Sequence, residues 1–172
     1  MMTSLIQYNF LFGTGFDVHA LEALDHDHRM MLCGVPVPCR YQVIAHSDGD
    51  VGLHALVDAI LGAIAAGDIG EHFSPSDERW KNADSTVFVS HALQLCAHAN
   101  AIIVNADITL IAEHPKISLY KLAMRKRIAA LLHVPIERVS VKATTTERLG
   151  FLGRSEGIAA QAAVSIKIPA KE

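Results

Sequence analysis

Apolar residues recur every three or four positions in three segments of the chain, which is the spacing of an amphipathic helix. The first segment, 51–66, reads VGLHALVDAILGAIAA, and Asp50 directly before it is a residue type that caps helices. The same spacing predicts a second helix over about 84–99 and a third over about 118–132. We therefore expect three helices.

Other segments alternate apolar and polar residues, the pattern of a half-buried strand. Glycine, proline and short polar residues interrupt the chain between the periodic segments. They predict a loop or hairpin over 22–45 and a loop over 67–83. The segments that read as strands are 13–21, 101–111, 139–144 and 157–168.

The order of these elements predicts the fold class. Strand, helix, helix, strand, helix, strand, strand is typical of an α/β sandwich, an α+β arrangement in which helices cover one face of a mixed β-sheet. No linker or repeat divides the chain, so we expect one domain over 1–172. On the last strand, Ala159, Gln161 and Ala163 share a face and leave room for a partner subunit, although alanine-rich strands also occur in plain cores.

Composition narrows the class of protein. Of the 172 residues, 51% are hydrophobic and 19% charged, which indicates a folded domain rather than a disordered chain. A formal charge of −3 argues against a nucleic-acid binder. Three cysteines without CxxC spacing, no basic residue before Arg29 and no long apolar run favour a cytoplasmic protein with no membrane contact.

The strand near the N-terminus carries two residues that can bind metal. Asp17 and His19 have the same parity, so they point to one side of the strand while Phe16 and Val18 point to the other. A carboxylate and an imidazole on one face can bind Zn²⁺. Two polar residues specify little by themselves, and the wet face of an edge strand is the alternative interpretation.

A second candidate segment, AHSDGDVGLHALVD, spans 45–58. His54 lies near the start of the first helix, and Asp58 four residues later can accept a hydrogen bond from its ring. With Asp17 and His19, His54 would complete a two-histidine, one-carboxylate set with an open fourth position. A lone histidine near a helix start is more often a surface residue, and spacing does not prove that the three residues meet.

The third candidate segment is KATTTERLGFLGRSEG, 142–157. Threonine hydroxyls and free backbone N–H groups bind phosphate oxygens, and Glu147 can hold a divalent cation that bridges phosphates. The simpler interpretation is a strand end followed by a polar turn. Each segment alone is therefore open to both readings.

Taken together, these segments resemble one family, 2-C-methyl-D-erythritol 2,4-cyclodiphosphate synthase of the non-mevalonate isoprenoid pathway. The matches follow the family's order and spacing over nearly the whole chain. The chain departs from the usual pattern at LFGTG (11–15), at the segment 22–33 and at the loop FSPSD (73–77). The matching segments are GFDVH at 15–19, AHSDGDVGLHAL at 45–56, GDIGEHF at 67–73, ADITLIAEHPK at 106–116 and KATTTERLGFLGRSEGIA at 142–159.

The resemblance implies a homotrimer with active sites at subunit interfaces. It implies conversion of 4-diphosphocytidyl-2-C-methyl-D-erythritol 2-phosphate to the cyclic 2,4-diphosphate with release of CMP. Zn²⁺ would be held by Asp17, His19 and His54 and act as Lewis acid and template. Mg²⁺ or Mn²⁺ would bind Glu147 and the substrate phosphates, while the catalytic positions credited with stabilising the transition state would be His46 and Thr145.

The resemblance also implies a set of substrate contacts. A loop closes over the substrate, a backbone-lined pocket reads the cytosine, and Phe151 and Arg154 border a central cavity that in some members holds an isoprenoid diphosphate. The matching substrate positions are Ser47, Asp58, Asp68, Ile69, Gly70, Phe73, Ser74, Pro75, Ser76, Asp77, Ala112, Glu113, His114, Pro115, Lys116, Ile117, Ser118, Thr144 and Thr146.

Two other functions compete with this one. A zinc-bearing nucleotide-binding module without catalysis would keep the base pocket but lack one of His46, Thr145 or Glu147, and all three are present. A zinc phosphohydrolase would use the metal to activate water, and its products would be linear phosphates rather than a ring.

Overall fold

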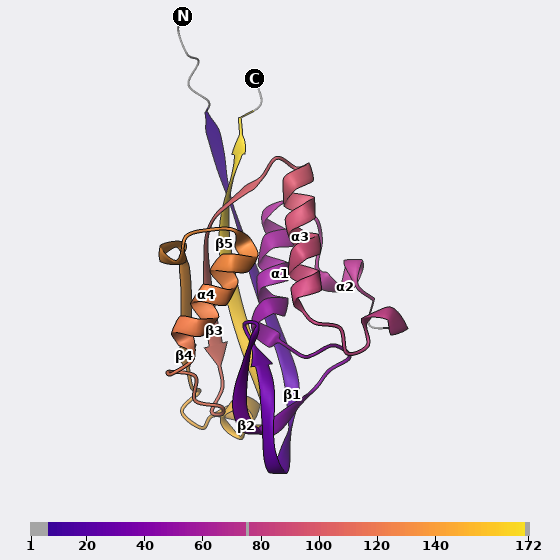
Figure 1. The fold of residues 1–172 in the computed structure, drawn as a ribbon, viewed down its shortest axis with the longest axis vertical. Coiled ribbons are helices and arrows are strands. Elements are labelled where there is room, and N and C mark those ends of the chain that lie inside the picture. Colours follow the sequence, from indigo (N-terminus) through magenta and orange to yellow (C-terminus); the bar gives the residue numbers. More distant parts are fainter. Residues whose placement is uncertain (1–6, 75, 171–172) are drawn as a thin grey trace, which may run out of the picture.

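The computed structural model describes residues 7–74 and 76–170. A five-stranded sheet is built from a long hairpin, β1 (Tyr8–Leu32) and β2 (Val35–Ile44), and from β3 (Ile102–Ile111), β4 (Val139–Thr144) and β5 (Gly157–Pro169). Three longer helices pack against it, as Figure 1 shows: α1 (Val51–Ala63), α3 (Thr86–His98) and α4 (Lys121–Leu132). Short helices complete the described chain: α2 (Ile69–His72), α5 (Gly150–Gly153) and two 3-10 turns at Glu78–Trp80 and Ile136–Arg138.

The sheet is mixed, with strand order β2-β1-β5-β3-β4. The strand β1 pairs antiparallel with β5 from Tyr8 to Ala20, and its far half pairs with β2 to form the hairpin at the bottom of Figure 1. The strand β3 is antiparallel to β5 and parallel to β4. The predicted α+β class is therefore confirmed, and β1 is an interior strand rather than an edge.

Helix α1 lies at the centre of the core. It packs on β1 and β5, and α3 packs on its other side, which explains why it is buried almost all around instead of along one stripe. Gly13 and Gly15 permit this approach, because a Cβ at either position would overlap backbone of α1, at Ala59 and Ala55 respectively. The close approach fixes the position of β1 along the axis of α1, and with it the distance of Asp17 and His19 from the first turns of that helix.

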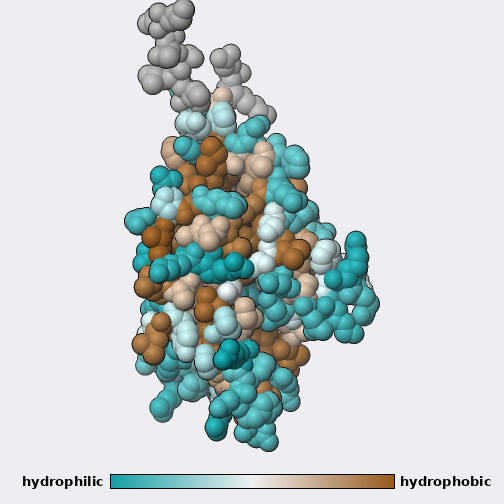
Figure 2. All heavy atoms as spheres, viewed as in Figure 1, coloured by the Kyte–Doolittle hydropathy of each residue, from teal (hydrophilic) through white to brown (hydrophobic). Residues whose placement is uncertain are grey.

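The opposite face of β1 is left uncovered in the single chain. Phe12 is 75% exposed and Phe16 58% exposed, and Phe10 and Val18 continue the same face. On the side seen in Figure 2, hydrophilic residues cover the segment that protrudes around α2, at the right of the view. No helix among the described residues combines the length and apolarity that a membrane crossing requires.

Two predicted loops contain more regular structure than their composition indicates. The segment 22–45 is the hairpin alternative of the prediction: its turn at Cys33 and Gly34 is packed against Asp50, and its register shifts between Ala23 and His28, where Asp25, His26 and Asp27 are exposed. The segment 67–83 contains α2 and a 3-10 turn, each started by an aspartate: Asp68 accepts from the Glu71 N–H and Asp77 from the Arg79 N–H. The predicted helices and the predicted strands 101–111, 139–144 and 157–168 agree with the structure to within three residues at each end, whereas the predicted strand 13–21 is the middle of the longer β1.

Candidate active site

Three candidate ligands converge between β1 and α1. Asp17 Oδ2 lies 3.0 Å from His19 Nε2 and 3.0 Å from His54 Nδ1, and the two ring nitrogens are 3.0 Å apart. One ligand atom from each residue lies within 4.8 Å of the other two, which is the spacing that one metal ion requires. The face of β1 that carries Asp17 and His19 is thus turned toward α1 and does not form the wet face of an edge strand.

A buried carboxylate holds the start of α1 in place. Asp50 is fully buried and accepts from the N–H groups of Leu53, Cys33 and Gly34 at 3.0, 2.7 and 2.6 Å. Burial raises the pKa of the Asp50 carboxyl, although these three donors oppose the shift. The predicted helix cap therefore also ties α1 to the turn of the β1–β2 hairpin, which positions His54.

The electrostatics of the cluster favour an ionised carboxylate. Burial of Asp17 disfavours its charge, but its contacts with the imidazoles of His19 and His54 together outweigh that cost and hold the pKa of the Asp17 carboxyl well below its usual range. The donor set is one carboxylate oxygen and two imidazole nitrogens, which suits a tetrahedral Zn²⁺ site with an open position.

The second nitrogen of His54 is held by residues other than the predicted one. His54 Nε2 lies 2.9 Å from Ser85 Oγ and 3.2 Å from Ser47 Oγ. Asp58 instead accepts from the Ile69 N–H at 2.8 Å, so its predicted role as the partner of the His54 ring is wrong. One helical turn separates His54 from Asp58. The Asp58 side chain faces α2, where its bond to the Ile69 N–H holds a residue that lines the cleft beside the cluster.

A cleft of about 310 Å³ opens above the cluster. His46 and Ser47 border it from the loop before α1, and Phe73 is held by aromatic contacts with Phe88 at 4.6 Å and Trp80 at 5.0 Å between ring centroids. The cleft is lined by Asp17, His19, Ile44, Ala45, His46, Ser47, His54, Ile69, Gly70, Phe73, Trp80 and Phe88.

Of the described residues of the predicted closing loop, 73–77, only Phe73 lines this cleft. Ser74 and Ser76 hydrogen bond to each other at 2.8 Å and are exposed, and Asp77 pairs with Arg79. Pro75 lies outside the described residues. Asp68 is exposed and caps α2, so of the predicted contacts in this region Ile69, Gly70 and Phe73 line the cleft directly.

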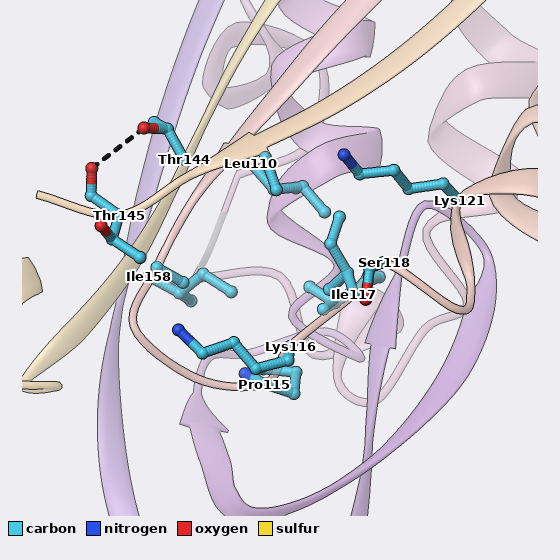
Figure 3. Close-up of a pocket in the computed structure, with 12 residues that line it drawn as sticks. Leu110, Pro115, Lys116, Ile117, Ser118, Lys121, Thr144, Thr145 and Ile158 are labelled. Atoms are coloured by element: carbon cyan, nitrogen blue, oxygen red, sulfur yellow. Dashed lines mark hydrogen bonds between the residues drawn. The ribbon is translucent and has the colours of Figure 1, made fainter.

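A separate pocket of about 220 Å³ lies where β3 and β4 end. Figure 3 shows the 115–118 segment on one side of it, Thr144 and Thr145 on another, and the side chain of Lys121 entering from the start of α4. The pocket is lined by Leu32, Leu110, Ala112, Pro115, Lys116, Ile117, Ser118, Lys121, Ala143, Thr144, Thr145 and Ile158.

Two predicted residues of the 112–118 segment support the pocket from outside. Glu113 accepts from the Arg148 N–H at 3.2 Å, and His114 stacks on Tyr41 of β2 with ring centroids 5.8 Å apart. Neither is among the residues that line the pocket. They fix the segment to the neighbouring turn and to β2.

The turn after β4 is strained and internally bonded. Glu147 and Arg148 both adopt left-handed backbone angles, with φ of 52° and 63°, a conformation that costs about 1–3 kcal/mol per residue. Thr145 Oγ1 donates to Glu147 Oε1 at 2.9 Å, and Thr146 Oγ1 donates to the Leu149 carbonyl at 2.7 Å. The turn presents the Thr145 hydroxyl and the Glu147 carboxylate together at the edge of the pocket, as a phosphate and cation site requires.

The single chain does not bring all predicted residues together. Of the described residues, none lines both the metal-side cleft and the 112–118 pocket. Neither Phe151, which is exposed, nor Arg154, which pairs with Glu156 at 2.9 Å, is among the residues that line the two pockets. The Asp17–His19–His54 cluster and the Thr145–Glu147 turn are thus two separate parts of a site.

Sequence reasoning missed several residues of these sites. Ser85 stands 31 positions from His54, and no local pattern links the two. Trp80 lies in the segment predicted as a loop and Phe88 in the predicted helix 84–99, and neither had a predicted role; the basic cluster that contains Lys121 was interpreted as a solvated helix face. Only the fold places these side chains at the cleft and the pocket.

Comparison with known proteins shows similarity over most of the chain. The model of the YgbB family matches residues 10–167. A 2-C-methyl-D-erythritol 2,4-cyclodiphosphate synthase of Xanthomonas campestris pv. campestris is 58% identical over 159 residues, which is 92% of this chain and 96% of the relative. A bifunctional IspD/IspF enzyme of Bradyrhizobium diazoefficiens is 55% identical, but the match covers 39% of its length.

Solved structures with a similar fold belong to proteins of the same name. The bifunctional IspDF of Campylobacter jejuni superposes with a TM-score of 0.88 at 40% identity, over 94% of this chain and 43% of that one. The Plasmodium falciparum IspF in complex with CDP superposes with a TM-score of 0.81 at 34% identity, over 94% of this chain and 97% of that one. The chain belongs to the YgbB family, whose curated relatives are named 2-C-methyl-D-erythritol 2,4-cyclodiphosphate synthases.

Proposed function

We propose that the chain converts 4-diphosphocytidyl-2-C-methyl-D-erythritol 2-phosphate to 2-C-methyl-D-erythritol 2,4-cyclodiphosphate and CMP, in non-mevalonate isoprenoid biosynthesis. The observation that carries the proposal is the convergence of Asp17, His19 and His54 at 3.0 Å spacings, in a chain 58% identical to a synthase of that name. The reaction is an internal phosphoryl transfer in which the 2-phosphate oxygen attacks the β-phosphorus and CMP leaves.

The metal of the Asp17–His19–His54 cluster is proposed to be Zn²⁺. Asp17 Oδ2, His19 Nε2 and His54 Nδ1 would hold it, and the hydrogen-bonded carboxylate provides one negative charge. When bound there, Zn²⁺ supplies Lewis-acid polarisation of a phosphoryl oxygen. The protein's own contribution is a preformed set of three ligands beside an open cleft, which lets substrate approach from one side.

The phosphate-handling residues lie around the second pocket. Glu147 would hold Mg²⁺ or Mn²⁺ together with the substrate phosphates, and the Thr145 hydroxyl, 2.9 Å from that carboxylate, would donate to a phosphoryl oxygen. His46, exposed at the metal-side cleft, would donate to the same group from the other side. Phosphoryl transfer needs positioning and charge neutralisation more than covalent help, and these groups provide both.

The base and sugar contacts complete the proposal. Backbone groups of 112–118 would read the cytosine, and Thr144 and Thr146 would face the diphosphate. The metal-side cleft would hold the methylerythritol and ribose. The proposed contacts there are Ser47, Asp58, Asp68, Ile69, Gly70 and Phe73, together with the loop 74–77.

We further propose that three chains assemble with each active site between two of them. Two observations support this: the two pockets share no lining residue among those described, and the face of β1 with Phe10, Phe12 and Phe16 is apolar and uncovered. Phe151 and Arg154 would then border a central cavity able to take an isoprenoid diphosphate. We also propose that the enzyme is cytoplasmic, which the free cysteines Cys33, Cys39 and Cys96 support because a reducing compartment keeps thiols unpaired, and that 1–172 is one domain.

The product distinguishes this function from its competitors. Purified protein is incubated with the substrate, Zn²⁺ and Mg²⁺ and followed by phosphorus NMR, with His54→Ala as the inactive control. We expect a cyclic diphosphate and an equal amount of CMP, both lost in the control. Linear phosphates would identify a phosphohydrolase, and CDP binding without turnover would identify a non-catalytic module.

A further inference from the structure

A chain of hydrogen bonds runs from the Asp17–His19–His54 cluster through the buried Ser85 to the half-buried Asp48. His54 Nε2 lies 2.9 Å from Ser85 Oγ, and Ser85 Oγ donates to Asp48 Oδ1. The Ser85 N–H donates to the other oxygen of Asp48 at 3.1 Å. The three residues come from α1, from the position before α3, and from the loop before α1. The chain therefore joins three segments behind His54.

The direction of each bond follows from what each group can donate. An ionised carboxylate only accepts, so the Ser85 hydroxyl proton points to Asp48. Ser85 Oγ is then left as an acceptor, and His54 Nε2 must carry the proton that it receives. In that tautomer the lone pair of the His54 ring is on Nδ1, the atom that lies 3.0 Å from both Asp17 Oδ2 and His19 Nε2. The Asp17 carboxylate also accepts, so in the metal-free protein it competes with Ser85 for the ring proton.

We propose that Ser85 is a positioning residue that, together with Asp48, holds His54 in the Nε2–H tautomer that metal ligation through Nδ1 requires. The inference rests on the proposed function in one respect, namely that the ion held at this cluster is Zn²⁺. An acceptor behind a ligating imidazole fixes both the tautomer and the ring plane, and loss of such a partner typically lowers metal affinity about 10- to 100-fold.

Among the described contacts, the Ser85 hydroxyl bonds to His54 and Asp48 and to no other group. Ser85 is fully buried, and although it occupies the N-cap position of α3, its side chain makes no capping bond. The first turn of α3 is capped instead by Asp84, which accepts from the Thr86 N–H at 2.8 Å. Removal of the hydroxyl should therefore leave α3 intact and change the bonding of His54 and Asp48.

Ser47 is a second hydroxyl within reach of His54 Nε2, and its bonding differs from that of Ser85. Its Oγ lies 3.2 Å from His54 Nε2, farther than that of Ser85, and it also accepts from the Gly49 N–H at 3.2 Å. It makes no bond to Asp48 among the described contacts, so nothing directs its hydroxyl proton away from His54. Ser47 can keep the ring in place but does not fix which nitrogen is protonated.

The test uses the whole chain 1–172 in three variants: Ser85→Ala, Ser85→Thr and, as a matched control on α3, Ser90→Ala, whose exposed hydroxyl donates to the Thr86 carbonyl. Zinc affinity is measured by competition with a chromophoric chelator. Nitrogen-15 NMR of the metal-free protein at alkaline pH reports the His54 tautomer. We expect Ser85→Ala to lose about 10- to 100-fold in zinc affinity and to show mixed tautomers, whereas Ser85→Thr and Ser90→Ala keep both properties of wild type.

Each outcome is decisive. Unchanged affinity and a pure Nε2–H tautomer in Ser85→Ala would overturn the proposal. A predominant Nδ1–H tautomer in the wild type would overturn it without any variant, even if Ser85→Ala failed to fold. A wild type that shows the Nε2–H tautomer but binds no Zn²⁺ would contradict the proposed function while leaving the role of Ser85 supported.

Discussion

Asp17 and His54 stand 37 positions apart in the chain, yet Asp17 Oδ2 lies 3.0 Å from His54 Nδ1. The contact exists because two glycines of β1 let α1 approach the strand and because Asp50 fixes where α1 begins. The geometry of the Asp17–His19–His54 cluster therefore depends on how closely β1 and α1 pack, so a change that disturbs this packing should also change the ability of the cluster to bind metal.

The first prediction concerns the acid stability of the metal-free protein. Because the pKa of Asp17 is lower in the folded state, its charge stabilises the fold above its unfolded-state pKa of about 3.9, and this contribution is lost as the pH falls below that value. In Asp17→Asn the contribution is absent at every pH. Urea denaturation from neutral to acidic pH should show the two free energies of unfolding converging toward low pH, and parallel profiles would contradict the prediction.

The second prediction concerns the close contact of β1 with α1. In Gly15→Ala the new methyl group would overlap the Ala55 carbonyl, and overpacking of this kind costs about 1–3 kcal/mol or more. Zinc affinity should fall as well, since Asp17 lies on the displaced strand. Gly62→Ala on the same helix is the control: its Cβ meets nothing closer than 3.8 Å, and the exposed helical site should gain about 0.5–1 kcal/mol. Equal effects of the two variants in urea denaturation would refute this account of the packing.

The third prediction concerns a histidine pair behind the cleft. His72 Nε2 donates to the Ala66 carbonyl at 2.8 Å, so its Nδ1 accepts from His91 Nε2 at 3.2 Å, and the His91 ring contacts Phe73 edge-on at 5.0 Å. Burial, and then the charge of His72, lower the pKa of His91. The neutral pair should hold Phe73 at the cleft.

This pair gives the protein a pH-dependent contribution to stability. Because the folded-state pKa of His91 is lowered, the contribution is present above its unfolded-state pKa of about 6.5 and is lost as the pH falls through the folded-state value. His91→Ala should flatten this part of the stability profile and raise KM for the substrate several-fold at unchanged zinc affinity. A changed zinc affinity with an unchanged KM would show that the pair supports the metal cluster instead.

The fourth prediction concerns the exposed face of β1. Phe12→Asp places a charge in the proposed contact between chains, so the trimer should dissociate and activity should be lost, while the free chain keeps its far-ultraviolet circular dichroism. Val87→Asp, at another exposed apolar position on α3, should leave assembly and activity unchanged. Light scattering coupled to size-exclusion chromatography measures the mass. A Phe12→Asp protein of unchanged mass would exclude this face as the contact.

The local patterns of the sequence predicted most of the fold, because each depends on neighbouring residues. The alternation of Phe16, Asp17, Val18 and His19 predicted which side chains share a face, and the structure turns Asp17 and His19 toward α1. The spacing in 51–66 predicted α1, which ends at Ala63. The pattern over 22–45 left loop and hairpin both open, because the exposed polar residues Asp25, His26 and Asp27 interrupt the alternation where β1 bulges.

The parts of the site that depend on tertiary contacts were not predictable from periodicity. Helical spacing made Asp58 the expected partner of the His54 ring, but the fold brings Ser85 there and leaves Asp58 bonded to the Ile69 N–H. Lys121 resembled a solvated charge until the ends of β3 and β4 were seen to form a pocket beside it. In each case the decisive neighbour is distant in sequence.

The most direct test of the shared active site is complementation between two inactive variants. His54→Ala lacks a ligand of the metal cluster, and Thr145→Ala lacks a phosphate donor of the other pocket. The two are co-expressed with different tags, and mixed trimers are purified and assayed for the cyclic product. If each site joins two chains, every mixed trimer has one of its three sites with both halves intact, so activity should return to about a third of that of wild type. Mixed trimers no more active than either variant alone would mean that each site lies within one chain.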